Sequence, residues 1–174
     1  KVVAEDPINI KAAQLMGKLH DVLKETGYDG HALEHFLVRL LFLEFAEDTA
    51  IFERRLFTEF IENRTHEDGS DIGSRFTELF QVLNTPFDKR LKNLDENLAS
   101  FPYVNGKLFA EFLPIPSFDS KMRDILLECC YLDWSKISPA IFGSLFQSIM
   151  DKAHRRNLGA HYTSEANILK LIRP

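Results

Sequence analysis

The spacing of apolar residues in the first quarter of the chain predicts two helices of different kinds. From 10 to 26 the apolar residues recur every three to four positions, which places them on one face of an amphipathic helix, and Gly27 is positioned to end it. From 32 to 46 the apolar residues cover nearly the whole circumference, as in a helix surrounded by neighbours. We therefore expect 32–46 to be the central helix of an α-helical domain.

Further helices are expected along the rest of the chain. Helical spacing over 52–63, 72–83 and 87–98 predicts three of them, and Pro86 separates the last two because proline disfavours helix at the preceding residue. A polar loop at 65–70 has nothing to bury and is a candidate for disorder. The apolar run from Met122 to Cys130 predicts another helix, and Ser138 followed by Pro139 is typical of the start of one more, which should end near Gly159.

The segment 101–112 interrupts this helical period. Asn105-Gly106 lies between the apolar pairs Tyr103-Val104 and Leu108-Phe109. Asn-Gly between apolar pairs is typical of a two-residue β-hairpin turn. The predicted fold is therefore mainly α, a multi-helix domain with one short β-hairpin near 101–112.

Composition and charge narrow the class of protein. The 174 residues, 45% of them hydrophobic, suffice for one domain with a sizeable core. With 21 Lys+Arg against 26 Asp+Glu, the chain is not expected to be a freestanding DNA-binding module, since phosphate contacts need a basic surface. The chain has no membrane-spanning apolar run, and the adjacent Cys129 and Cys130 in an apolar stretch read as reduced core residues of a cytoplasmic protein. The absence of an initiator Met, and an end at Pro174 in mid-pattern, lead us to expect a piece of a longer chain.

The last residues carry the most specific pattern. Gly159-Ala160-His161-Tyr162-Thr163 reads as a helix end, a short extended step, and a new helix capped by Thr163 or Ser164. Free backbone N–H groups at such a helix start can receive a carboxylate or a phosphate. Upstream of it, Lys152, Arg155 and Arg156 are candidates for contacts with a DNA phosphate, although basic residues in a last helical turn also complement the helix dipole.

Three stretches, in fixed order, resemble the MmeI-like fused restriction-modification enzymes. They are 101–109, with Phe-Pro-Tyr-Val-Asn-Gly-Lys-Leu-Phe, 133–150, which begins Asp-Trp, and 159–174, whose Gly-Ala-His-Tyr-Thr resembles the opening motif of adenine-N6 DNA methyltransferases fused to endonucleases. The resemblance implies that Gly159, Tyr162 and Thr163 belong to an S-adenosylmethionine site. It also implies a helical spacer over 1–157 and the N-terminal edge of a methyltransferase domain over 158–174, with a nuclease domain upstream. The parent enzyme would bind duplex DNA, methylate adenine and cut with a Mg²⁺-dependent nuclease.

The chain carries no complete active site of its own. A methyltransferase needs a Gly-rich loop after a strand and an Asn/Asp-Pro-Pro-Tyr/Phe tetrapeptide that holds the flipped adenine. Asn84-Thr85-Pro86-Phe87 is one residue from that tetrapeptide, but it precedes the cofactor motif and joins two expected helices. We therefore expect no catalytic residue in this chain and no cofactor bound by it alone.

Two alternatives stay open. His31, Glu34 and His35 satisfy the His-x-x-Glu-His pattern, in which two histidines bind zinc and the glutamate is the general base of a metallopeptidase. Against this, the pattern lies in a first helical turn, where polar residues are normally solvated, and no third ligand is identifiable downstream. We therefore expect no metal site. The chain could also be a free helical adaptor; metal analysis and the sequence after Pro174 distinguish these possibilities.

Overall fold

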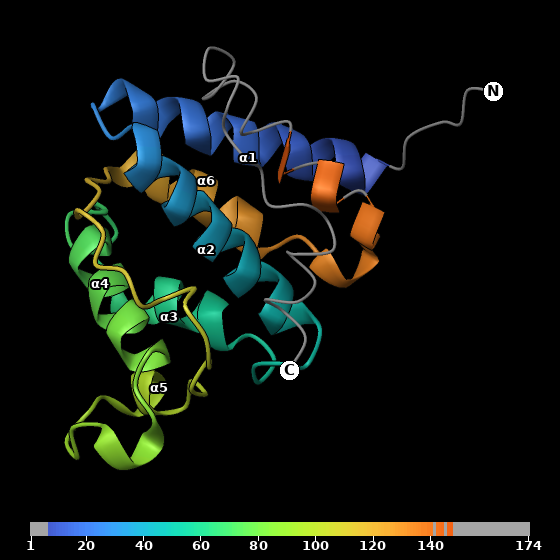
Figure 1. The fold of residues 1–174 in the computed structure, drawn as a ribbon. Coiled ribbons are helices and arrows are strands. Elements are labelled where there is room, and N and C mark those ends of the chain that lie inside the picture. Colours follow the sequence, from blue (N-terminus) through green and yellow to red (C-terminus); the bar gives the residue numbers. More distant parts are fainter. Residues whose placement is uncertain (1–6, 141, 145, 148–174) are drawn as a thin grey trace.

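The computed structural model describes residues 7–140, 142–144, 146 and 147, which form a helical bundle (Figure 1). Residues 139, 140, 142–144, 146 and 147 are also helical, so the helix start predicted at Pro139 is confirmed. No described helix is both long and apolar enough to cross a bilayer. The elements are α1 Pro7–Glu25, α2 Gly30–Asp48, α3 Leu56–Arg64, α4 Ile72–Leu83, the 3-10 helix η1 Phe87–Lys89, α5 Glu96–Ala99, α6 Ser120–Cys130 and the 3-10 helix η2 Trp134–Lys136.

Helix α2 is the centre of the molecule, as predicted. It runs between α1 on one side and α3 and α4 on the other, and α6 packs against both α1 and α3 (Figure 1). Buried phenylalanines form much of the core around it: the ring of Phe36 makes edge contacts with the rings of Phe76, Phe80 and Phe118 at centroid separations of 5.0–6.3 Å. Such aromatic pairs add stabilisation beyond the apolar area they bury.

The predicted helix over 52–63 begins four residues later, at α3. Ala50 and Arg55 both adopt positive φ, 66° and 63°, which interrupts a right-handed helix. Phe52 owes its burial to packing on the rings of Phe42 and Phe101 rather than to a helical face. The loop at 65–70 is an ordered turn, in which Asp71 accepts from the backbone N–H of His66.

The predicted helix over 87–98 is wrong. Only η1 and the single turn of α5 form there, and Phe87 and Leu91 remain exposed, so the segment has no buried apolar face to hold a helix together. Arg90 instead donates to the backbone oxygens of Val82, Thr85 and Phe101. The guanidinium of Arg90 therefore stabilises residues 84–99, which we call the lobe after α4.

The β-hairpin predicted near 101–112 is also wrong, because these residues, all described, contain no strand. The backbone N–H of Val104 donates to the carbonyl of Leu83 at the end of α4, and the carbonyls of Leu108 and Glu111 accept from Arg39 of α2. A hairpin across Asn105-Gly106 would pair Val104 with Lys107, but the Val104 N–H donates to Leu83 and the Lys107 carbonyl accepts from the N–H of Ala110. We call residues 101–119, which join α5 to α6, the strap.

Candidate functional site

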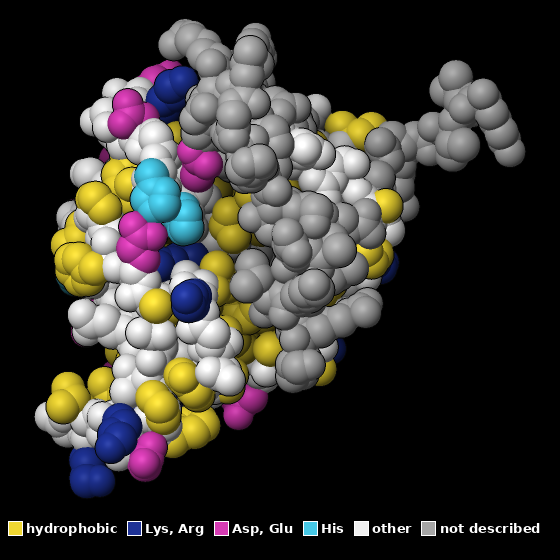
Figure 2. All heavy atoms as spheres, in the orientation of Figure 1, with side chains coloured by type: hydrophobic (Ala, Val, Ile, Leu, Met, Phe, Trp, Pro, Cys, Tyr) yellow, Lys and Arg dark blue, Asp and Glu magenta, His cyan; other side chains and the backbone are white. Residues whose placement is uncertain are grey.

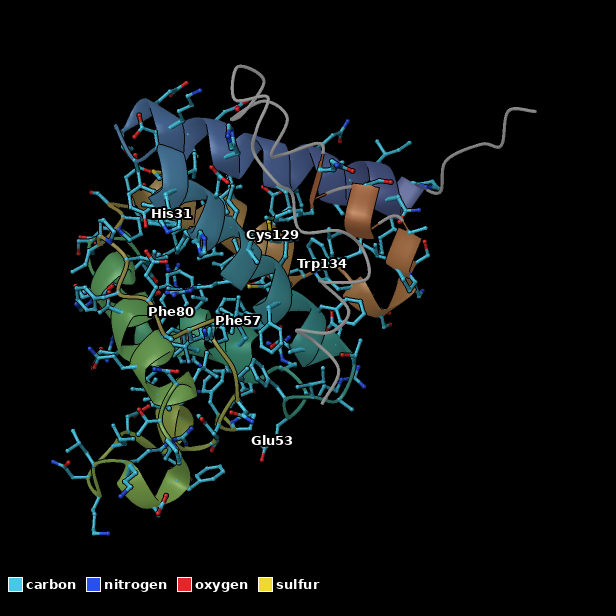
Figure 3. The ribbon with its side chains drawn as sticks, viewed as in Figure 1. His31, Glu53, Phe57, Phe80, Cys129 and Trp134 are labelled. Atoms are coloured by element: carbon cyan, nitrogen blue, oxygen red, sulfur yellow. The ribbon has the colours of Figure 1, made fainter. Side chains whose placement is uncertain are left out.

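Two histidines at the start of α2 meet a carboxylate of the strap. His31 and His35 are one helical turn apart, so their side chains leave the same face of α2. His31 Nε2 lies 2.9 and 2.8 Å from the two carboxylate oxygens of Glu111, and His35 Nδ1 lies 4.0 Å from Glu111 Oε1. The two imidazole rings are 4.0 Å apart between centroids. Figure 2 shows histidines side by side on this face with an acidic side chain against them, and Figure 3 marks His31 near the start of α2.

Contacts with α2 hold Glu111 beside the two histidines. Arg39, one turn beyond His35, is buried and donates from Nη2 to the carbonyl oxygen of Glu111 at 2.7 Å and from Nε to that of Leu108 at 2.8 Å. Its guanidinium lies 4.8 Å from the ring centroid of Phe80, which adds a cation–π contact. The hydroxyl of Tyr28 donates to the carbonyl of Pro114 at 2.8 Å. Side chains from the α1–α2 junction and from α2 therefore fix the backbone of the strap.

The electrostatics of this cluster follow from burial and from these neighbours. The hydrogen bond from His31 lowers the pKa of Glu111, and the charges of His31, His35 and Arg39 lower it further. Partial burial, followed by the neighbouring His31, lowers the pKa of His35, although Glu111 acts in the opposite direction. Burial raises the pKa of Tyr28 to about 12. At neutral pH the cluster therefore presents an ionised carboxylate beside a neutral His35 imidazole.

The sequence pattern identified two of these three residues. Glu111 lies 80 positions from His31, and no signal in the sequence connects them. A metallopeptidase also needs a substrate cleft beside its histidines, yet a cavity of about 870 Å³ lies at the opposite end of α2, between Asp48, Arg54 and Tyr131. The peptidase alternative gains no support from this arrangement.

A second group of charged side chains, not predicted from the sequence, lies at that opposite end of α2. Glu47 accepts from the backbone N–H and the hydroxyl of Thr58, and Asp48 accepts from the backbone N–H of Trp134. Glu44 is fully buried, and the Cys130 side chain lies close enough to interact with its carboxyl group. Burial raises the pKa of all three carboxyl groups. The sequence signal for this group is a single acid, Glu44, within the otherwise apolar stretch 40–46 of α2.

The other sequence-predicted site residues lie outside the described residues. These are Gly159, Tyr162 and Thr163 for the cofactor, and Lys152, Arg155 and Arg156 for DNA phosphates. Asn84-Thr85-Pro86-Phe87 joins α4 to η1, and the backbone N–H of Asn84 caps α4 by donating to Phe80. The tetrapeptide is therefore a helix end, in agreement with the sequence interpretation.

Comparison with known proteins finds similarity to restriction-modification enzymes and DNA methyltransferases. The family model of the MmeI helicase spacer domain matches residues 31–109. A solved structure of the type IIL restriction-modification enzyme MmeI in complex with DNA is 71% identical, with a TM-score of 0.79, over 98% of this chain and 23% of that chain.

Two curated relatives point the same way. DNA methyltransferase A of Bacillus subtilis (strain 168) is 43% identical over 98% of this chain and 20% of its own length. A predicted type II restriction enzyme and methyltransferase of Methanocaldococcus jannaschii is 30% identical over 73% of this chain and 13% of its own length. The chain thus spans about a fifth or less of the length of these relatives.

Proposed function

Because this chain is an MmeI-like helical spacer, we propose that it connects a nuclease domain to an adenine-N6 DNA methyltransferase domain in one restriction-modification enzyme. The likeness to the MmeI chain carries the proposal, since it extends over nearly all of this chain and only part of a longer one. Residues 1–157 would be the spacer, and 158–174 would be the first edge of the methyltransferase domain. The parent enzyme would act on duplex DNA in the cytoplasm.

The described fold suits a connector that holds its neighbours in fixed relation. One continuous core joins the helices, and arginine side chains fix the irregular segments between them. A closely packed body of this kind is rigid, so it can hold two flanking domains at a fixed distance and orientation. Large apolar side chains stay exposed in two separate regions, Phe87 and Leu91 on the lobe after α4, and Phe112 and Ile115 on the strap. Adjacent exposed apolar groups mark interaction surfaces in many proteins. We propose these two regions as contacts with the flanking domains.

The cofactor chemistry belongs to the parent enzyme in this proposal. S-adenosylmethionine would supply the methyl group, and Gly159, Tyr162 and Thr163 would contribute one part of its site. Lys152, Arg155 and Arg156 would contact DNA phosphates, and Mg²⁺ would serve the nuclease domain. The resemblance of the Gly-Ala-His-Tyr-Thr segment and the similarity to a DNA methyltransferase support this assignment.

The test uses the full-length enzyme. Tyr162→Ala should weaken binding of S-adenosylmethionine, measured by calorimetry, whereas the control Tyr103→Ala, on an exposed tyrosine of the strap, should leave that affinity unchanged. Unaltered cofactor affinity in Tyr162→Ala would show that the motif has been misread. The 174-residue chain alone should transfer no labelled methyl groups to DNA, and transfer by it would contradict the connector role.

A further inference from the structure

We propose that His31, His35 and Glu111 form a binding site for one divalent transition-metal ion, Zn²⁺ above all, that clamps the strap to the first turns of α2. Ligand atoms of the three residues all lie within 4.8 Å of one another. This site is independent of the connector function proposed above, and it revises the expectation of no metal, which depended partly on the missing third ligand. Glu111 is that ligand.

The geometry lies close to that of a bound ion. An ion with bonds of about 2.0–2.2 Å in a tetrahedral arrangement holds its ligand atoms roughly 3.3 Å apart. His31 Nε2 and the Glu111 oxygens are slightly closer than this, at 2.8–2.9 Å, and His35 Nδ1 is slightly farther, at 4.0 Å. The side chains of His31, His35 and Glu111 are 60%, 42% and 49% exposed, so small rotations can bring all three to bonding distance.

The chemistry of the ligands selects the class of metal. Two imidazole nitrogens and one carboxylate oxygen suit Zn²⁺, Ni²⁺ and Cu²⁺, whereas Mg²⁺ and Ca²⁺ prefer oxygen ligands. Two histidines one turn apart on a helix form a chelating pair because the backbone already holds them on one face. The exposure of the site leaves the remaining coordination positions to water. The site is therefore a surface clamp, and no hydrolytic step is assigned to it.

The nearby positive charge of Arg39 does not occupy the ligand atoms. Arg39 donates to the backbone oxygens of Leu108 and Glu111, and it faces the rings of Phe80 and Phe109. The Glu111 carboxylate thus keeps its oxygens for the histidines, and an ion would take the place of the proton that His31 and Glu111 share. The strap is already bonded to the protein through Arg39 and Tyr28, so binding costs little reorganisation of the backbone.

Calorimetric titration of the metal-free chain with Zn²⁺ tests the site. We expect one equivalent to bind. His31→Ala, His35→Ala and Glu111→Gln should each weaken binding at least about tenfold, because even substitutions of residues that only support metal ligands cost about 10–100-fold in affinity. His66→Ala is the matched control: His66 is an exposed histidine 3.6 Å from the Asp71 carboxylate, and its loss should leave the affinity unchanged. Zn²⁺ should also raise the thermal midpoint of the wild type and not that of Glu111→Gln.

Co²⁺ provides a second readout that reports on the ligands directly. Its visible absorption spectrum should change on binding to the wild type and stay that of the hydrated ion with Glu111→Gln. Circular dichroism confirms folding of the variants, whose substituted side chains are exposed. Absence of saturable binding would overturn the proposal, as would an equal loss of affinity in His66→Ala. Unaltered affinity in Glu111→Gln would overturn it too, since the ion would then be held without the strap.

Discussion

The Nη2 atom of Arg39 lies 2.7 Å from the backbone oxygen of Glu111, so a cation buried in the central helix holds the strap in place. Its Nε atom donates to Leu108 as well, and the phenylalanine rings of α4 and the strap flank the guanidinium. A planar guanidinium serves two carbonyls at once, which the single ammonium of a lysine does less well. Arg39 therefore fixes the part of the strap between Leu108 and Glu111, and Tyr28 fixes the strap at Pro114.

Arg39→Leu should destabilise the chain by about 2–4 kcal/mol, because two backbone oxygens lose their charged donor. The stability of Arg39→Lys should lie between those of the wild type and Arg39→Leu. The control Arg75→Ala removes a partly exposed arginine that pairs with Glu78, and it should cost at most about 1 kcal/mol. Urea unfolding followed by circular dichroism measures all three. Equal stability of Arg39→Leu and the wild type would mean that the strap is held by its apolar contacts alone.

Gly73→Ala should destabilise the fold where α4 meets the strap. A Cβ atom at Gly73 would collide with the backbone oxygen of Pro116 and lie 2.6 Å from Cγ2 of Ile115. We expect a loss of about 1–3 kcal/mol. Gly17→Ala is the matched control within α1, where nothing lies within 4 Å of the added atom, and it should stabilise by about 0.5–1 kcal/mol. Chemical denaturation gives both values, and a Gly73→Ala variant as stable as the wild type would show that α4 and the strap are not closely packed.

The helices that the sequence predicts correctly are those whose apolar residues repeat over several turns. Such repeats locate α1, α2, α4 and α6, because each helix must bury one face or all of its surface. The strap and the lobe after α4 are different. Their backbone groups are bonded to arginine side chains, and Arg39 lies 69 and 72 positions from the carbonyls it contacts. No local pattern reports a bond of that kind, so Asn105-Gly106 was misread as a hairpin.

The candidate metal site likewise combines residues that a local sequence pattern predicts with one that only the fold brings close. His31 and His35 are recognisable because their spacing matches a helical turn, a property of the local sequence. Glu111 comes to them only through the path of the strap, which the sequence does not predict. A local motif can therefore supply part of a site, and the fold has to supply the rest.

Cys129 and Cys130 should react with thiol reagents only when the chain unfolds. Both are free and buried, and burial raises the pKa of each thiol well above its ordinary value, which keeps the reactive thiolate scarce. Labelling with a chromogenic disulfide in buffer should be slow, and two thiols should react at once in denaturant. Rapid modification of either thiol in buffer would show that the core between α6 and α2 opens readily.

Glu44→Gln should make the chain more stable at neutral pH and leave it nearly unchanged in acid. Burial raises the pKa of Glu44 well above its ordinary value, and the neighbouring Glu47 and Asp48 raise it further. In the unfolded chain this carboxyl group loses its proton at about pH 4.3. As the pH rises through that value towards the folded pKa, the unfolded state releases a proton that the folded state retains, so the free energy of unfolding falls.

Glutamine cannot ionise, so the variant should lose this part of the pH dependence. In urea unfolding at a series of pH values, the wild type and Glu44→Gln should have equal midpoints at about pH 4. The midpoint of Glu44→Gln should then exceed that of the wild type by an increasing amount as the pH rises to neutrality. Glu47→Gln is the matched control, because both oxygens of Glu47 accept from Thr58 and an amide nitrogen would replace one acceptor by a donor. That variant should be less stable than the wild type at neutral pH. If Glu44→Gln were destabilising there as well, Glu44 would be ionised and paired in the folded chain, contrary to its position in the core.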